Sequence, residues 1–289
     1  MQDYIVRGTD KERNFRFFGA YTRNMVDEAC QKHQTTPVVA AALGRTMTGA
    51  AMMAHMLKSA TDRVSIIIKG DGPIGGIVVE ADGMGSVKGY PYNPQADIPN
   101  KPNGKLDVSG VIGNAVMTVI KDMGLKEPYT GQVAMLSGEI AEDLTYYFAT
   151  SEQTNSVVIL GVLVDVDYTI KEAGGIIIQV LPNAQEEAIT ALENKLGAFH
   201  SMTQYLDENK SVEEIIGLLL DDIEIMDKTD IGFKCDCSKG RMEKALISIG
   251  REDLQEIAEE EEQIELVCHF CNEKYHFSKE HIEGLIKAL

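Results

Sequence analysis

The chain has 289 residues, a length that predicts about two domains. Its 45 Asp and Glu outnumber its 27 Lys and Arg and give a net charge of −18. A surface this acidic repels phosphate backbones and anionic lipid headgroups, so we expect neither nucleic acid nor a membrane as a partner.

The N-terminus and the cysteines indicate the compartment. Residues 1–18 carry no apolar run of the kind found in a signal peptide, and no run in the chain approaches the ~18 apolar residues of a membrane span. We therefore expect a cytoplasmic protein. In that reducing compartment, closely spaced cysteines more often bind metal or act in redox chemistry than form structural disulfides.

The first part of the chain alternates segments typical of strands and of helices. Thr36 followed by Pro37 is typical of a helix start, and the Ala-, Leu- and Met-rich run over 38–60 predicts one long helix behind it. Further helices are predicted at Asn24–His33 and Ile140–Thr150, and strands at Tyr4–Gly8, Asn14–Thr22, Arg63–Lys69, Ile77–Glu80, Ser86–Tyr90, Gln132–Leu136, Ser156–Val164 and Gly175–Leu181.

The turn Gly70–Gly75 matches the spacing G-x-G-x-x-G of dinucleotide sites. Such a site needs a helix after the glycines, whereas Ile77–Glu80 reads as a second strand, so we predict a hairpin turn. We find no Ser/His/Asp arrangement, P-loop or paired-carboxylate motif in the sequence. These observations favour a protein that is not an enzyme.

Neighbouring strands followed by strands between helices favour an α+β fold, with a mixed, largely antiparallel sheet and helices packed on it. After Pro182 the pattern becomes helical and acidic. We predict three parts: an N-terminal α+β core domain over 1–182, a helical acidic linker over 183–230 and a small C-terminal zinc-binding domain over 231–289. The linker is expected either to dock on the core as a second switch or simply to pack there as a surface helix, through Ile215, Ile216, Leu218, Leu219 and Leu220.

Four of the five cysteines fall within 37 residues, as Cys235-x-Cys237 and Cys268-x-x-Cys271. Two close cysteine pairs can supply the tetrahedral thiolate set that zinc prefers. A unit of this size has little apolar core, and a metal is a common remedy. Spacing alone favours a structural zinc site and leaves redox-active thiols as an alternative. The eight acidic residues over 252–265 disfavour thiolates, so we expect zinc to keep these thiols deprotonated.

Three other side chains are candidates for the same chemistry. His269 lies inside the C-x-x-C turn and His276 follows it, but four cysteines already complete a tetrahedron, so neither is expected to be a ligand. Cys30 lies in the predicted helix Asn24–His33 and is expected to be a packing residue.

Several motifs occur together with the cysteine pattern in a fixed order: AAALGRTMTGA at Ala40–Ala50, KGDGPIGG at Lys69–Gly76, GSVKGYPYNP at Gly85–Pro94 and GGIIIQVLPNA at Gly174–Ala184. With them, the chain resembles the bacterial 33 kDa chaperonin family of redox-regulated heat-shock holdases nearly from end to end.

The resemblance implies an ATP-independent chaperone that is inactive while its four thiolates bind one zinc ion per chain. Oxidation would form the disulfides Cys235–Cys237 and Cys268–Cys271, expel zinc and unfold the zinc-binding unit and the linker. The exposed apolar surface would then bind unfolding client proteins, and the activated chain would dimerise. The alternatives are a constitutive zinc-ribbon binding module and a thiol oxidoreductase that uses Cys268-x-x-Cys271.

Overall fold

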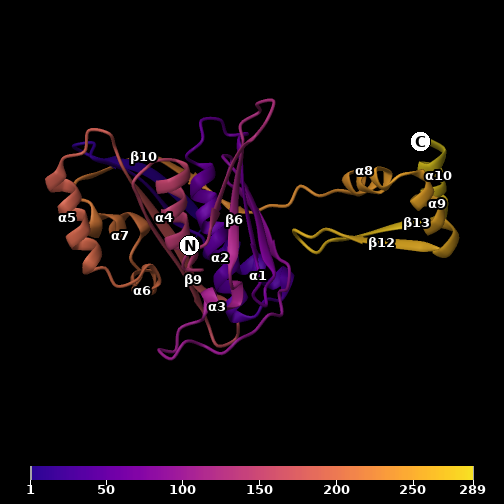
Figure 1. The fold of residues 1–289 in the computed structure, drawn as a ribbon, viewed down its shortest axis with the longest axis horizontal. Helices are drawn as coiled ribbons and strands as arrows, with labels where there is room; N and C mark the ends of the chain where they lie inside the picture. The colour runs from indigo at the N-terminus through magenta and orange to yellow at the C-terminus, as the bar shows by residue number, and fades with distance from the viewer. Residues whose placement is uncertain (1, 289) are drawn as a thin grey trace. The chain divides into compact units, whose positions relative to one another are not determined.

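Figure 1 shows the computed structural model, which describes residues 2–288. The chain divides into two compact units, one up to Lys234 and one from Cys235 onward. The predicted α+β class is confirmed. The three-part division, with a linker over 183–230, stays a prediction, and the helices of that segment belong to the first unit. Among the described residues, no helix is both long and apolar enough to cross a membrane.

A five-stranded antiparallel sheet in the first unit has the order β10-β1-β2-β9-β8. Successive side chains of a strand point to opposite faces. Along β2, Phe18 and Ala20 therefore enter one apolar core, while Phe17 and Tyr21 enter another. The strands are β1 (Tyr4–Asp10), β2 (Phe15–Tyr21), β8 (Ser156–Val164), β9 (Ile170–Val180) and β10 (Ile223–Asp230).

The second sheet has six strands in the order β11-β5-β4-β3-β6-β7. The short strand β11 runs parallel to β5, and the other pairs are antiparallel, so the predicted mixed, largely antiparallel character is confirmed. The strands form two sheets in this unit where one was expected, and β6 and β10 were not predicted. The strands are β3 (Arg63–Gly70), β4 (Gly76–Asp82), β5 (Ser86–Pro91), β6 (Ala115–Asp122), β7 (Tyr129–Ala134) and β11 (Gly232–Phe233).

Helix α2 (Pro37–Ala54) is the buried centre of the first unit, in contact with strands of both sheets. It begins at the predicted Pro37 with Thr36 as N-cap. The predicted continuation to residue 60 is wrong. The helix ends at Ala54 with His55 as its C-cap, and the Asp62 carboxylate accepts a hydrogen bond of 3.1 Å from the Ser59 backbone N–H in the turn that follows. The neighbouring helices are α1 (Arg23–His33), α3 (Val108–Ile112) and α4 (Ile140–Ser151).

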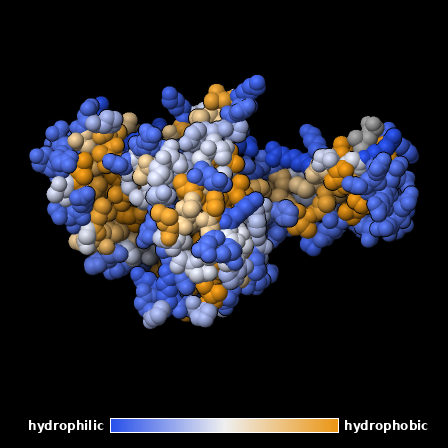
Figure 2. All heavy atoms as spheres, viewed as in Figure 1, coloured by the Kyte–Doolittle hydropathy of each residue, from blue (hydrophilic) through white to orange (hydrophobic). Residues whose placement is uncertain are grey.

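Three further helices, α5 (Glu186–Gly197), α6 (Met202–Asp207) and α7 (Val212–Leu219), cover the other face of the five-stranded sheet. Gly19 of β2 allows the close approach of α7, since a Cβ there would lie 2.5 Å from Val212 Cγ1. Figure 2 shows apolar surface in the region of α5 and α7. We call the side of the sheet that these helices cover the helix-covered face. The residues of the helix-covered face are Tyr4, Val6, Phe15, Phe17, Tyr21, Ile176 and Ile178.

The predicted apolar face of the linker is largely right. Four of its members are buried, but Leu218 is 42% exposed, so the prediction is wrong at that position. Leu218 lies on the outer side of α7, away from the sheet that its neighbours contact. The four buried members are Ile215, Ile216, Leu219 and Leu220.

The second unit is a two-stranded hairpin with three helices. Its described residues include a small core of six buried apolar side chains, among them Leu254, Phe277 and Ile282. The elements are α8 (Lys239–Ile249), α9 (Arg251–Glu260), β12 (Gln263–Val267), β13 (Lys274–Ser278) and α10 (Lys279–Ala288).

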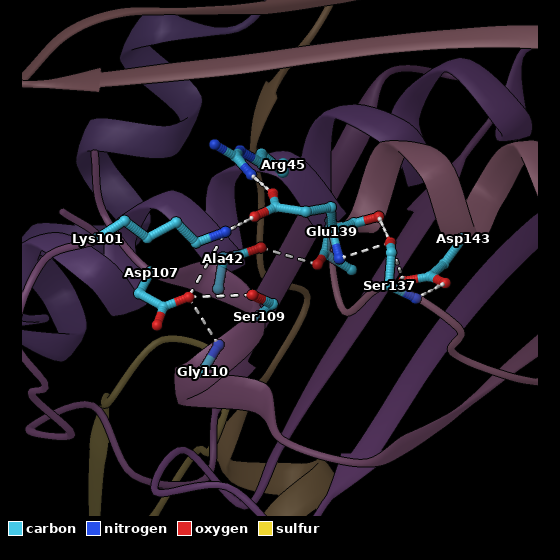
Figure 3. Close-up of polar contacts among 10 residues, drawn as sticks. Ala42, Arg45, Lys101, Asp107, Ser109, Gly110, Ser137, Glu139 and Asp143 are labelled. Carbon is cyan, nitrogen blue, oxygen red and sulfur yellow. Dashed lines mark hydrogen bonds and ion pairs between the residues drawn. The ribbon is translucent and has the colours of Figure 1, made fainter. Parts of the chain in front are cut away.

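A polar cluster in the first unit joins the Pro-rich loop before α3 to α2 and α4 (Figure 3). The Glu139 carboxylate accepts hydrogen bonds from Arg45 at 2.5 Å and from Lys101 at 2.8 Å. Burial alone would raise the pKa of Glu139, but the hydrogen bond from Lys101 and the charge of Arg45 outweigh it, so the pKa lies below its usual value. Charge-assisted hydrogen bonds thus tie this loop to two helices.

We expect Glu139→Gln to lower the free energy of unfolding of the first unit by about 1–2 kcal/mol near neutral pH, a value reduced for solvent screening. Because the folded-state pKa of Glu139 is lowered, its contribution is present above the unfolded-state pKa of about 4.3 and is lost as the pH falls through the folded-state value. Urea unfolding of both proteins near neutral pH and under acid conditions measures the difference. An equal loss under both conditions would contradict the assignment, and Glu208→Gln, at an exposed ion pair with Lys210, is the control.

Candidate metal centre

The four C-terminal cysteines come from two separate segments of the second unit. Cys235 and Cys237 lie in the extended chain before α8, and Cys268 and Cys271 lie in the turn between β12 and β13. That turn is closed by two backbone hydrogen bonds, from Cys268 N–H to the Glu273 carbonyl and from the residue after Cys271 back to the Cys268 carbonyl, at 2.9 and 2.8 Å. The hairpin therefore sets the spacing of its two sulfurs.

The four sulfur atoms lie within 4.8 Å of one another and form a possible metal-binding site. The Sγ atoms of Cys235 and Cys268 are 3.7 Å apart, and those of Cys237 and Cys271 are 3.3 Å apart. Sulfurs at about 2.3 Å from a tetrahedral zinc ion would be roughly 3.8 Å from one another. The four sulfurs therefore fit one tetrahedral ion. Each of the two close pairs joins a cysteine of the segment before α8 with a cysteine of the hairpin.

Burial opposes the thiolate form at this site. Burial raises the pKa of Cys235 to about 11 and also raises the pKa of Cys271. Burial acts on Cys237 in the same direction, but hydrogen bonds from Tyr275 and from the neighbouring thiols outweigh it and lower the pKa of Cys237. Without a cation, burial therefore favours the protonated thiol at Cys235 and Cys271.

The histidines considered as ligands lie close to this centre in sequence, but the metal-binding group found among the described residues consists of the four cysteines. His269 is in the hairpin turn itself. His276 lies on β13 with its Nε2 atom 3.7 Å from the Glu265 carboxylate. That they are not ligands stays a prediction.

Cys30 lies on α1 in the first unit and is only 4% exposed. Burial raises the pKa of its thiol to about 12. Thiolates, not thiols, are the reactive species, so burial disfavours the reactive form of this cysteine in the folded chain.

Tyr275 contributes to the centre and was not predicted. Its hydroxyl donates a hydrogen bond of 3.1 Å to Cys237 Sγ. The cysteine spacing does not indicate this partner, because the contact depends on how the hairpin and the segment before α8 meet. The local signal is only an aromatic residue four positions after Cys271.

Comparisons with known proteins find relatives over nearly the whole chain. The family model described as "Hsp33 protein" matches residues 3–278. The chain is 49% identical to the 33 kDa chaperonin of Ruminiclostridium cellulolyticum, over 99% of both chains. It is 48% identical to that of Clostridioides difficile, over 100% of both. The crystal structure of the 33 kDa chaperonin from Thermotoga maritima matches with a TM-score of 0.92 at 34% identity, covering 100% of this chain and 99% of that one.

We expect iodoacetamide to alkylate Cys30 roughly a thousandfold more slowly than an ordinary thiol in the metal-free chain, as long as its first unit is folded, because the raised pKa leaves little thiolate near neutral pH. Peptide mass spectrometry over a labelling time course measures the rate at each cysteine. The same labelling in urea is the control, in which Cys30 should react like the other four. Labelling of Cys30 in the folded chain as fast as that of Cys237 would contradict the assignment.

Proposed function

The chain belongs to the Hsp33 family, and from this premise we propose that it is a redox-regulated, ATP-independent holdase that binds unfolding proteins under oxidative stress. The observation that carries the proposal is the meeting of four thiols from two segments in a unit with a small apolar core. Such a unit depends on the link between its segments for its fold.

We propose that Cys235, Cys237, Cys268 and Cys271 hold one zinc ion per chain as thiolates. The bound ion would supply a cationic cross-link between the segment before α8 and the hairpin. Zinc binding stabilises small structural units by about 10–16 kcal/mol, as much as the roughly 5–15 kcal/mol net stability of a typical domain. Loss of these four ligands would therefore unfold the second unit.

Oxidation removes the ligands when the thiols of each segment pair, as Cys235–Cys237 and as Cys268–Cys271. Each pair of thiolates gives up two electrons as its S–S bond forms, and one molecule of hydrogen peroxide takes up these two electrons and two protons from the solvent to give two water molecules. Which thiols pair determines whether the two segments stay linked after oxidation. Disulfides between the segments would replace the metal as a cross-link, whereas disulfides within each segment release the two segments from each other.

The helix-covered face is the surface that we propose for client binding. Helix α7 is tied to it by polar contacts as well as by apolar packing, because the Tyr4 hydroxyl donates to the Glu213 carboxylate at 2.7 Å. Lys228 on β10 donates to the same carboxylate at 2.9 Å, and its ammonium lies 3.6 Å from the centre of the Tyr4 ring. Release of α5–α7 would expose a contiguous apolar sheet surface, which is what an unfolding protein can bind.

The oligomeric state, compartment and partners complete the proposal. An exposed apolar face also favours self-association, so we propose that the activated form is a homodimer. We propose that the protein acts in the cytoplasm as a binding protein and not as an enzyme, and that neither nucleic acid nor a membrane is its partner. Its acidic surface, with a net charge of −18, supports these last two points.

Treatment of the reduced, zinc-bound chain with peroxide at elevated temperature is expected to release about one zinc per chain and to produce activity against client aggregation that the reduced form lacks. A colorimetric zinc assay and light scattering of a thermally unfolding client measure the two effects. Cys30→Ala should respond as the wild type does, whereas Cys268→Ser should bind zinc weakly from the start.

The disulfides are mapped in the same oxidised sample by peptide mass spectrometry. Bonds between the two segments would contradict the release mechanism. Equal activity of the reduced form would support the constitutive zinc-ribbon alternative, and catalytic turnover of a dithiol substrate would support the oxidoreductase alternative.

Gly19→Val is expected to displace α7 and to give the reduced, zinc-bound chain part of the activity of the oxidised form. The added side chain would overlap Val212 Cγ1 and Ile216 Cδ1, which lie 2.5 and 2.7 Å from a Cβ at this position, and overpacking of this kind typically costs about 1–3 kcal/mol. Client light scattering and limited proteolysis of residues 183–230 measure the release. Gly217→Ala is the matched control, since α7 has open space there and the substitution should stabilise the helix. Proteolysis of the linker without any gain in activity would contradict the placement of the client surface.

A further inference from the structure

Tyr275 connects the cysteine cluster to the apolar core of the second unit. We propose that it is a positioning residue for the metal centre: its hydroxyl holds Cys237 Sγ in the orientation of a ligand, and its ring ties that sulfur to the core. This inference rests on the proposed function, because it takes the four thiolates as the metal ligands.

The position of Tyr275 is fixed by the hairpin. It pairs with Leu266 across β12 and β13, and both side chains pack as partly buried residues against the core that contains Phe277 and Ile282. From this position the hydroxyl reaches Cys237 Sγ at 3.1 Å. Cys237 lies in the extended segment before α8, so the contact joins the two segments that supply the ligands.

The contacts of the other sulfurs show what this contact supplies. Cys235 Sγ lies 3.7 Å from Cys268 Sγ, and Cys271 Sγ lies 3.3 Å from Cys237 Sγ, so these contacts are with sulfurs of the cluster. Cys237 has a side-chain donor, the Tyr275 hydroxyl. Hydrogen bonds to a ligand atom orient it and are stronger when the acceptor is charged, so this contact favours the thiolate arrangement that a metal requires.

The hydroxyl therefore has an effect that is separate from the packing of the ring. Removing the hydroxyl alone should weaken metal binding about 10- to 100-fold, the effect typical of a lost hydrogen bond to a ligand. It should also make Cys237 the most easily alkylated of the four cysteines in the zinc-bound chain. A purely structural role in the core would change neither the metal spectrum nor the order in which the cysteines react.

The test compares the reduced full-length chain with Tyr275→Phe, which keeps the ring. Competition with a chelator measures zinc affinity, the absorption of the cobalt-substituted protein reports the thiolate ligands directly, and iodoacetamide labelling gives the rate at each cysteine. We expect a 10- to 100-fold lower zinc affinity, a shifted thiolate-to-cobalt band and faster labelling of Cys237 relative to Cys235.

Two control variants separate the hydroxyl from the packing. Leu266→Val loosens the core beside Tyr275 but leaves the hydroxyl, so it should lower thermal stability without moving the cobalt spectrum. Tyr146→Phe removes a half-exposed hydroxyl from α4 in the other unit and should change nothing.

The outcomes are distinguishable from a failure of the proposed function. Wild-type affinity, spectrum and labelling order in Tyr275→Phe would overturn the positioning role while leaving the four-thiolate site intact. If Cys268→Ser binds zinc as tightly as the wild type, the four-thiolate site itself is wrong, and the role of Tyr275 is overturned with it.

Discussion

Four sulfur atoms within 4.8 Å of one another are the constraint on which the second unit depends. The segment before α8 and the β12–β13 hairpin meet at this point, and the apolar core beside it is small. Burial raises the pKa of Cys235 and Cys271, so these two thiols favour the protonated form unless a cation is present. The same closeness that makes the cluster a good metal site underlies our proposal that the fold of this unit depends on the state of its sulfurs.

In the first unit, the two faces of the five-stranded sheet are covered by different helices. Its central helix α2 is buried between two sheets, whereas the opposite face of the five-stranded sheet is covered by α5–α7. The helical segment contributes about half of the buried residues of the core on this face, and polar contacts such as that of Tyr4 with Glu213 also join it to the sheet. The residues packed around α2 form a separate core on the other face of this sheet, and the release of α5–α7 that we propose would not uncover that core directly.

Much of this architecture could be predicted from the sequence. β8 was predicted at its observed bounds, and α2 was predicted to begin where it does, at Pro37. β6 was missed although it has a readable period of two, with Ala115, Met117 and Val119 facing the core.

Other features of the structure could not be predicted from the local sequence. β10 is an acidic edge strand with mostly exposed side chains, so it resembles a solvated linker and is a strand only because it pairs with β1. The contact of Tyr275 with Cys237 likewise joins segments whose relation is set by the tertiary fold. Spacing predicted which cysteines would gather, but it could not predict what surrounds them.

The burial of Cys30 has a consequence for the reversibility of the proposed switch. Four thiols form two disulfides with none left over, whereas a fifth reactive thiol would leave an unpaired partner able to exchange with those bonds or to link two chains. Because Cys30 is 4% exposed and its pKa is raised to about 12, it stays outside this exchange for as long as the first unit is folded. An even number of reactive sulfurs lets a reductant return the oxidised chain to a single starting state.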